Sequence, residues 1–192
     1  MANMHKLPTW NSEGQLVCVV ESPRGARAKF KYDPALKVFT LNRALILGIA
    51  YPYDWGFIPS TMAEDGDPLD VMIFHDVPTF PGVVMACEAI GALLVTQKKS
   101  DGAPGRQPNH RIFAVPAGSE RDQHWEDARE LPKRVRKELE KFFVAAGALA
   151  NKDLEILDWV GPKEAVDLVK DAQKKWKKER DVADDRLEKE QR

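Results

Sequence analysis

The chain has 192 residues, with 29 Lys and Arg against 30 Asp and Glu, so its formal net charge is -1. This length suits one domain with a sizeable core, and we expect a single domain over residues 1–192. A net charge this close to zero creates no global field that would attract nucleic acid, and no apolar run approaches membrane-spanning length. We therefore expect neither nucleic acid nor a membrane as a partner.

The N-terminal stretch and the cysteines bear on location. Residues 1–14 are polar and lack the charged-then-apolar pattern of a leader, which predicts a loosely held arm. Cys18 and Cys87 each lie within an apolar segment. Their spacing permits a disulfide, but two buried free thiols in a reducing cytosol are the default expectation. We expect a cytoplasmic protein.

Short apolar or alternating segments predict strands along the first part of the chain. The predicted strands are residues 16–20, 28–32, 38–41, 71–74, 83–90, 93–96 and 111–115. The apolar residues 45–51 are expected to cross the core, and the Gly-, Pro- and Lys-rich residues 97–108 predict a mobile loop. Many short strands at close spacing, separated by turn signals, suggest a closed barrel.

Helical patterns follow in the last third of the chain. Residues 131–146 carry one apolar stripe, and Gly147 then predicts the helix end. A short strand is expected at residues 156–160, followed by a second helix after Gly161 and Pro162. Residues 171–192 are almost wholly charged and predict a solvated C-terminal helical extension. The fold class expected is α+β, mainly β.

The most informative stretch is residues 51–74, whose centre reads Asp65-Gly66-Asp67-Pro68-Leu69-Asp70. Three carboxylates this close repel one another unless a cation or protons compensate them. Asp-Gly-Asp-Pro is also ordinary turn chemistry. The spacing does not fit an EF-hand loop, and no apolar strand of the aspartyl-phosphate type precedes the first Asp. The cluster therefore predicts a hard divalent cation and phosphate chemistry.

Residues 65–71, Asp-Gly-Asp-Pro-Leu-Asp-Val, resemble the signature of the soluble (family I) inorganic pyrophosphatases. Segments similar to those of the family flank it in order, from the Glu at position 21 to the Ile-Phe-Ala-Val-Pro at 112–116, and the resemblance covers roughly residues 16–169. It implies a five-stranded OB-like closed barrel flanked by two or more α-helices. It also implies Mg²⁺-dependent hydrolysis of pyrophosphate, a small phosphate-containing substrate, and a homo-oligomer.

The resemblance also implies roles for individual residues. The metal ligands would be Asp65, Asp67, Asp70 and Glu21. Asp70 would bridge two ions, Glu21 would hold an outer ion through water, and Asp67 would accept the proton of the nucleophilic water. The substrate-binding residues would be Lys29, Arg43, Tyr51 and Arg111. Arg43 can bind phosphate oxygens as a bidentate fork, and Arg111 replaces a family Lys while keeping the cation.

The sequence departs from the family pattern within this same site. Lys31 stands where the family has a second carboxylate, and Trp55 stands where it has Tyr. The carboxylates that the family carries after the strand ending at Thr96 are absent by simple alignment, as is a Tyr-Lys pair after Phe143. We therefore expect fewer Mg²⁺ (or Mn²⁺) ions than the family's usual set. The candidate substitutes for the missing ligands are Asp54, Asp101 and Asn109.

Three functions remain open on these residues. The first is an Mg²⁺-dependent inorganic pyrophosphatase. The second is a divergent hydrolase of another phosphoanhydride, such as a triphosphate or nucleotide. In it Lys31, Lys98 and Lys99 would replace lost metal charge, and Trp55 could stack on a base; the pair Lys98 and Lys99 also fits a solvated loop. The third is a catalytically impaired phosphate-binding or scaffold homologue. The retained Asp cluster favours chemistry, because a scaffold has no physical need for it.

Overall fold

The computed structural model describes residues 3–99, 102–118, 125–148 and 150–190. Its strands are β1 (Leu16–Ser22), β2 (Ala28–Asp33), β3 (Val38–Ala44), β4 (Asp54–Ile58), β5 (Leu69–Ile73), β6 (Val84–Lys98), β7 (Arg106–Pro108), β8 (Arg111–Pro116) and β9 (Glu155–Val160). Its α-helices are α1 (Lys133–Ala148) and α2 (Pro162–Glu190), and short 3₁₀ turns lie at η1 (Met4–Lys6) and η2 (Ala128–Glu130).

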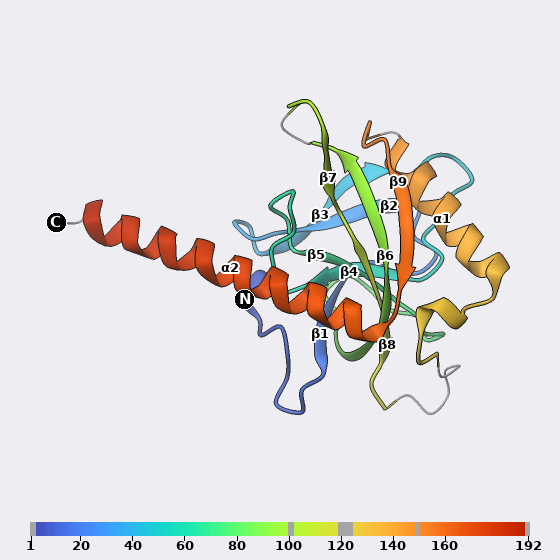
Figure 1. The fold of residues 1–192 in the computed structure, drawn as a ribbon, viewed down its shortest axis with the longest axis horizontal. Coiled ribbons are helices and arrows are strands. Elements are labelled where there is room, and N and C mark those ends of the chain that lie inside the picture. Colours follow the sequence, from blue (N-terminus) through green and yellow to red (C-terminus); the bar gives the residue numbers. More distant parts are fainter. Residues whose placement is uncertain (1–2, 100–101, 119–124, 149, 191–192) are drawn as a thin grey trace.

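Five strands form a closed ring of hydrogen-bonded pairs in the order β1, β4, β5, β8 and β6, because β6 pairs again with β1. The β5–β8 pair is parallel and the other four pairs of the ring are antiparallel. Strands β7 and β9 extend the sheet from β6, and β2 and β3 form a separate hairpin (Figure 1). The predicted mainly-β fold, a five-stranded barrel flanked by helices, is confirmed.

Two apolar clusters lie on opposite faces of the barrel strands. Strand β5 shows why, since its side chains alternate: Val71 and Ile73 belong to the cluster covered by α2, whereas Met72 belongs to the cluster covered by α1. Helix α2 contributes Val169, which is fully buried. A strand apolar on both faces has to be covered on both faces, and this requirement places the two helices.

Strand β6 corrects the expectation of two separate strands at 83–90 and 93–96. It is continuous over Val84–Lys98, and the register with β8 shifts between Ala89 and Gly91. Gly91 has a φ of 153°, and a Cβ there would lie 2.5 Å from the Val160 carbonyl oxygen. The glycine thus marks a bulge that bends one long strand, so that it can pair with four others, β1, β7, β8 and β9.

Other segments also differ from the expectations. Residues 45–51 do not cross the core, because Leu47 is 99% exposed and only the ends of the segment are buried. The described part of residues 97–108 is a β6–β7 hairpin rather than a mobile loop, with Gln97 paired to Gln107. Strand β4 was not predicted, since its Asp and Gly disfavour a strand by local propensity.

The N-terminal residues are held against the barrel more closely than expected for a loose arm. The Thr9 hydroxyl is buried and donates to the Pro59 carbonyl oxygen at 3.0 Å, and the Ser60 amide donates to the His5 carbonyl oxygen at 2.9 Å. The His5 ring meets the Phe57 ring edge-on, with 4.9 Å between centroids. Polar backbone and hydroxyl contacts thus fix a stretch whose composition alone suggests looseness.

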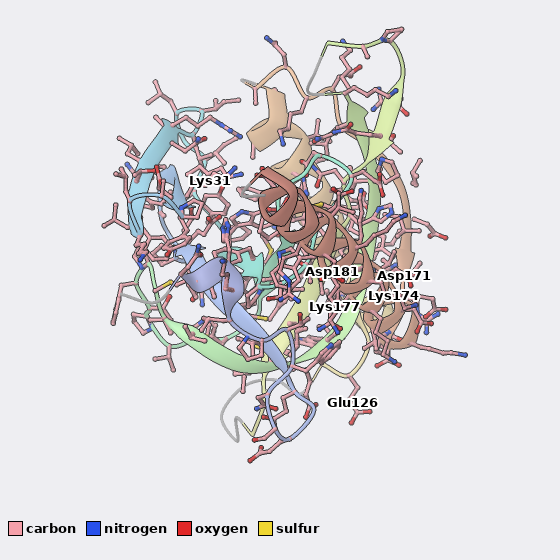
Figure 2. All side chains as sticks on the ribbon, turned by 90° about the vertical axis from the view of Figure 1, so that its left-hand side faces the viewer. Lys31, Glu126, Asp171, Lys174, Lys177 and Asp181 are labelled. Atoms are coloured by element: carbon pink, nitrogen blue, oxygen red, sulfur yellow. The ribbon has the colours of Figure 1, made fainter. Side chains whose placement is uncertain are left out.

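Helix α2 begins on the barrel and then projects away from it (Figure 1). At 1.5 Å per residue it extends over about 43 Å. Figure 2 shows Asp171, Lys174, Lys177 and Asp181 along this helix, which carries charge on its solvent side as predicted from the sequence. No helix in the described part of the chain is long and apolar enough to cross a membrane.

A glycine substitution tests the closest backbone approach in the barrel. A Cβ at Gly56 would lie 1.8 Å from the Val19 carbonyl oxygen of the neighbouring strand β1, so the strands would have to separate. We expect Gly56→Ala to lower the free energy of unfolding by about 3 kcal/mol or more, measured by urea denaturation. Gly14→Ala is the control, because its Cβ would meet open space and only its left-handed φ of 78° opposes it. Equal losses in the two variants would contradict the close approach.

Candidate active site

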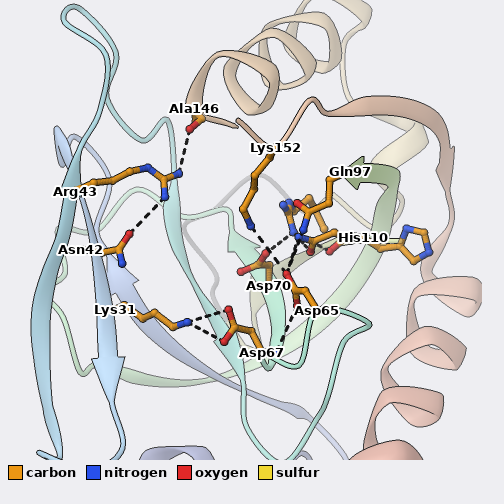
Figure 3. A network of polar contacts seen from close by, with 12 residues as sticks. Lys31, Asn42, Arg43, Asp65, Asp67, Asp70, Gln97, His110, Ala146 and Lys152 are labelled. Carbon is orange, nitrogen blue, oxygen red and sulfur yellow. Dashed lines mark hydrogen bonds and ion pairs between the residues drawn. The ribbon is translucent and has the colours of Figure 1, made fainter. Parts of the chain in front are cut away.

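Figure 3 shows Arg43 and the three aspartates Asp65, Asp67 and Asp70 around one region of the site, with Lys31 and Lys152 beside them. The β2–β3 hairpin brings Lys29 opposite Arg43 and also carries Lys31. The Asp cluster occupies the β4–β5 loop and the start of β5, where the parallel register sets Asp70 beside Arg111 of β8. The hairpin, loop and strand ends are far apart in the sequence, so the closed barrel and the hairpin beside it are both needed to place them together.

Each of the three clustered carboxylates has a partner from the chain itself. Both oxygens of Asp67 accept from Lys31 Nζ, at 2.8 and 2.9 Å. Asp70 is paired with Arg111 Nη1, in a contact where the Arg111 side chain is only 6% exposed. Among the described residues no three His, Cys, Asp or Glu side chains lie close enough together to hold one metal ion. At Asp67 and Asp70 the repulsion expected from the sequence is therefore relieved by cations of the protein.

Asp65 is compensated differently, mainly by neutral amides. Its Oδ2 accepts from Asn109 Nδ2 at 3.0 Å and from Gln97 Nε2 at 3.4 Å, and Lys152 Nζ lies 4.0 Å away. Burial raises the pKa of the Asp65 carboxyl, and the neighbouring Asp70 adds to the increase. Asp65 is thus a desolvated carboxylate that gains from any further positive charge.

Gln97 leaves one polar atom without a partner at this point. Its side chain is 1% exposed, and its Oε1 is buried with no hydrogen-bond partner in the described structure. Buried polar atoms are almost always paired, and the unpartnered carbonyl oxygen of an amide whose nitrogen faces Asp65 can serve as a ligand to a hard cation. The oxygen atoms of Asp65 and Gln97 fit a site for a small cation. Neutral amides lie at this site where further carboxylates would add negative charge.

A cationic pocket adjoins these carboxylates. Its polar lining residues are Lys29, Arg43, Tyr51, Asp70, Arg111 and Lys152. Arg43 Nη2 donates to the Ala146 carbonyl oxygen at 3.1 Å, whereas its Nε is buried and unpartnered in the described structure. Lys152 is half-buried, and burial lowers the pKa of its amine. Several cations converge where only Asp70 supplies negative charge, so the pocket is suited to an anion.

Lys152 was not predicted as a site residue. It lies in the turn between α1 and β9 and lines the pocket, where the sequence comparison found no cation after Phe143. Counting residues from Phe143 could not identify it, because its position depends on where α1 ends. The helix continues through Gly147 to Ala148 instead of ending at Gly147.

Glu21 and Tyr51 lie deeper than the carboxylate cluster. Glu21 is 5% exposed, its Oε1 accepts from the Tyr32 amide at 2.8 Å, and burial raises its pKa to about 7. Tyr51 is buried and stacks on Trp55 with 6.1 Å between ring centroids, and burial raises the pKa of its hydroxyl. Tyr51 therefore lines the pocket as expected, whereas Glu21 is ordered by the backbone of β2.

Trp55 does not offer a face to a nucleotide base. It is 4% exposed, and the Arg111 guanidinium lies 5.4 Å from its ring centroid. The ring therefore supports Arg111 through a cation–π contact, and the expected base stacking is wrong.

Of the described candidate substitutes for the missing metal ligands, Asn109 reaches the site and Asp54 does not. Asp54 is buried away from the pocket, where it accepts from the Arg24 amide at 2.7 Å and contacts His75 Nε2 at 2.8 Å and the Thr79 hydroxyl. Burial opposes ionisation of Asp54, but these hydrogen bonds outweigh it and lower the pKa. Asn109 does reach the site through Asp65, and Asp101 lies outside the described residues.

Lys98 and Lys99 do not line the pocket, so of the two interpretations of this pair the solvated one fits the structure, and the replacement of metal charge considered for the divergent hydrolase does not. Lys98 Nζ lies 3.5 Å from the Asp153 carboxylate and Lys99 is exposed. Of the three lysines considered for that role, Lys31 alone contacts the Asp cluster in the described structure.

The raised pKa of Glu21 predicts a pH dependence of stability. A carboxyl whose pKa rises from 4.5 unfolded to about 7 folded favours folding below pH 4.5, and this contribution is lost as pH rises to 7. We expect Glu21→Gln to remove this loss of stability. The free energy of unfolding of the variant, relative to that of wild type, should therefore rise by about 3 kcal/mol between pH 4.5 and pH 8. Urea denaturation across this range measures it, with the exposed Glu13→Gln as control. Parallel profiles for wild type and Glu21→Gln would refute the assignment.

Comparisons with known proteins agree with the geometry of this site. The family model described as inorganic pyrophosphatase matches residues 18–177. An inorganic pyrophosphatase of Thermus thermophilus is 36% identical over 88% of this chain and 95% of its own length, and one of Synechocystis is 33% identical over 91% and 99%.

Solved structures give the same result. The crystal structure of inorganic pyrophosphatase from Thermus thermophilus superimposes with a TM-score of 0.82 at 34% identity, covering 92% of this chain and 99% of that one. The inorganic pyrophosphatase of Neisseria gonorrhoeae reaches 0.78 at 26% identity, covering 89% and 96%. With its barrel, its Asp-Gly-Asp-Pro-Leu-Asp loop and its cationic pocket, the chain belongs to the inorganic pyrophosphatase family.

Proposed function

We propose that this protein is a phosphoanhydride hydrolase that converts inorganic pyrophosphate to phosphate. The observation that carries the proposal is the cationic pocket directly beside the Asp cluster. Its four cations are Lys29, Arg43, Arg111 and Lys152. A polyanion needs such an array to enter a poorly solvated site, and phosphoryl transfer needs little from the protein beyond positioning and charge stabilisation. Relatives named inorganic pyrophosphatases support the same substrate.

Different cations of the pocket would bind the two phosphoryl groups of pyrophosphate. Arg43 has an unpartnered Nε and can turn its guanidinium to phosphate oxygens as a fork. Lys29, opposite it on the hairpin, would neutralise the same group. Arg111, held between Asp70 and the Trp55 ring, would support the other group from the barrel side.

Asp67 is the proposed general base, and its ion pair with Lys31 shapes how it would act. Its side chain is 54% exposed and both oxygens are engaged by Lys31. An incoming phosphate competes for Lys31, which frees Asp67 to accept a proton from water. The water oxygen then bonds to one phosphorus, the bridging P–O bond breaks, and the leaving phosphate is stabilised by the pocket cations.

The family uses divalent metal, and the residues here fit a reduced set of ions. We propose Mg²⁺, with Mn²⁺ as a substitute, held by Asp65, by Asp70 and by the orphaned Gln97 Oε1. When bound, such an ion lowers the pKa of a water molecule and polarises phosphate oxygens. Asp67 stays a proposed metal ligand, and Glu21 stays a proposed ligand to an outer ion through water. The first is held by Lys31 and the second by the Tyr32 amide.

Two further proposals concern the setting of the protein. The free, buried thiols of Cys18 and Cys87 support a reducing, cytoplasmic location.

The exposed apolar side chains of Leu41 and Leu47, at 67% and 99% exposure, support the homo-oligomer expected from the resemblance.

The first experiment is phosphate release from pyrophosphate, tripolyphosphate and nucleoside triphosphates, with Mg²⁺, with Mn²⁺ and with chelator. We expect metal-dependent release from pyrophosphate, and we expect Asp67→Asn to slow it by about 10²–10⁴-fold because the proton acceptor is lost. Asp76→Asn is the matched control, since Asp76 is 79% exposed and pairs with Arg24 outside the pocket.

Three outcomes would change the proposal. Unchanged turnover in Asp67→Asn would remove Asp67 as the base. Release from another phosphoanhydride alone would favour the divergent hydrolase. No phosphate release from any of these substrates, with the fold intact, would favour the impaired phosphate-binding or scaffold homologue.

The metal proposal makes a separate prediction about Asn109. In Asn109→Asp an amide donor to Asp65 becomes a carboxylate that repels it, so we expect a lower melting temperature in chelator. Mg²⁺ should then raise the melting temperature more in the variant than in wild type, by about 2–4 °C per kcal/mol of added binding free energy. Thermal scans with and without millimolar Mg²⁺ measure this. An equal Mg²⁺ response in both proteins would place the ion elsewhere.

A further inference from the structure

The turn that carries Lys152 into the pocket has an unfavourable backbone conformation. Asn151 and Asp153, on either side of Lys152, have left-handed φ values of 51° and 45°. Non-glycine residues rarely adopt this region, although Asn and Asp tolerate it best, and such conformations persist only where the surroundings hold them. The direction of the Lys152 side chain therefore depends on what holds this turn.

Two main-chain hydrogen bonds hold Lys152 itself. The Lys98 amide at the end of β6 donates to the Lys152 carbonyl oxygen at 2.9 Å, and the Lys152 amide donates to the Gly147 carbonyl oxygen at 3.3 Å. These bonds tie the turn to the sheet and to the end of α1. They leave the flanking Asp153 to be held by side chains.

Arg106 of β7 supplies that side-chain contact. Its Nη1 donates to Asp153 Oδ2 at 3.2 Å and its Nη2 donates to the Asp153 carbonyl oxygen. Its Nε contacts Glu155 Oε2 at 3.1 Å and donates to the Thr96 hydroxyl at 3.0 Å. One guanidinium thus binds both the main chain and the side chain of Asp153 and anchors them to β6 and β9.

Sheet geometry explains how Arg106 reaches across. Strand β6 lies between β7 and β9, and Lys98 pairs with Arg106 while Thr96 pairs with Glu155 (Figure 1). Paired residues and residues two apart share one face of a sheet, so Arg106, Thr96 and Glu155 lie together. Gln97, between Thr96 and Lys98, points to the opposite face, where it contacts Asp65. The Arg106 network therefore lies behind the pocket and not in it.

We propose that Arg106 is a positioning residue that holds the 151–154 turn so that Lys152 reaches the phosphate pocket. The proposal rests on the proposed function for the role of Lys152, but the clamp on the turn stands on contacts alone. A planar fork can hold a carbonyl and a carboxylate of one residue at once, which a lysine ammonium cannot do in the same geometry.

Hydrogen exchange tests the clamp without any substrate. We expect Arg106→Ala to accelerate exchange of the Lys98 and Lys152 amides by roughly tenfold or more, because their hydrogen bonds depend on the turn. Arg134→Ala is the control, since it removes an exposed Arg–Glu138 ion pair on α1. Asp153→Asn keeps a residue that tolerates the left-handed region and should produce a smaller acceleration. Unchanged exchange at both amides in Arg106→Ala would overturn the proposal.

Binding of inorganic phosphate, followed by calorimetry, tests the consequence for the pocket. We expect Arg106→Ala to weaken binding by about tenfold, as Lys152→Ala does, and the double variant to be no weaker than either. Arg106→Lys should recover only part of the affinity. Weakening in Lys152→Ala but not in Arg106→Ala would overturn the positioning role. Absence of phosphate and pyrophosphate binding in wild type would count against the proposed function instead, and the exchange rates alone would then decide whether Arg106 holds the turn.

Discussion

The pairing of the site carboxylates with cations of the same chain is the constraint on which the site depends. Asp70 and Arg111 meet where the arginine side chain is 6% exposed, and Asp67 is held by Lys31. Removing one member of a buried pair commonly costs about 3–5 kcal/mol, because the remaining charge is left without compensation. The register of β5 against β8 and the approach of the β2–β3 hairpin are therefore coupled to the charges of the site.

The barrel determines which charges can meet. Asp70 and Arg111 are neighbours only because β5 and β8 run parallel, and Lys29 faces Arg43 only because β2 and β3 pair as a hairpin. The long strand β6 contributes side-chain contacts on both faces of the sheet. It places Gln97 against Asp65 on one side and Thr96 beside Arg106 on the other. A bulge at Gly91 bends this strand, so the fold and the site share a single structural element.

Local sequence patterns predicted the parts of the site that depend on local structure. The Asp65–Asp70 loop and the strands carrying Lys29 and Arg111 have turn, strand and family signals within a few residues. Lys152 and Gln97 had no such signal, because their positions depend on the end of a helix and on the register of a 15-residue strand. Asp54 shows the converse: it was a candidate substitute for a missing ligand, but strand alternation directs it to His75.

Charge compensation also links substrate and metal in the proposed function. Without substrate, Lys31 and Arg111 occupy the carboxylates that a divalent ion would need, and neutral amides cover Asp65. A pyrophosphate anion in the pocket competes for these cations, which leaves more negative charge on the Asp cluster and raises its affinity for a divalent ion. By linkage, the ion raises the affinity for pyrophosphate by the same factor. In the proposed function, the Lys and amides that stand in place of site carboxylates would therefore lower metal affinity in the free protein more than in the substrate complex.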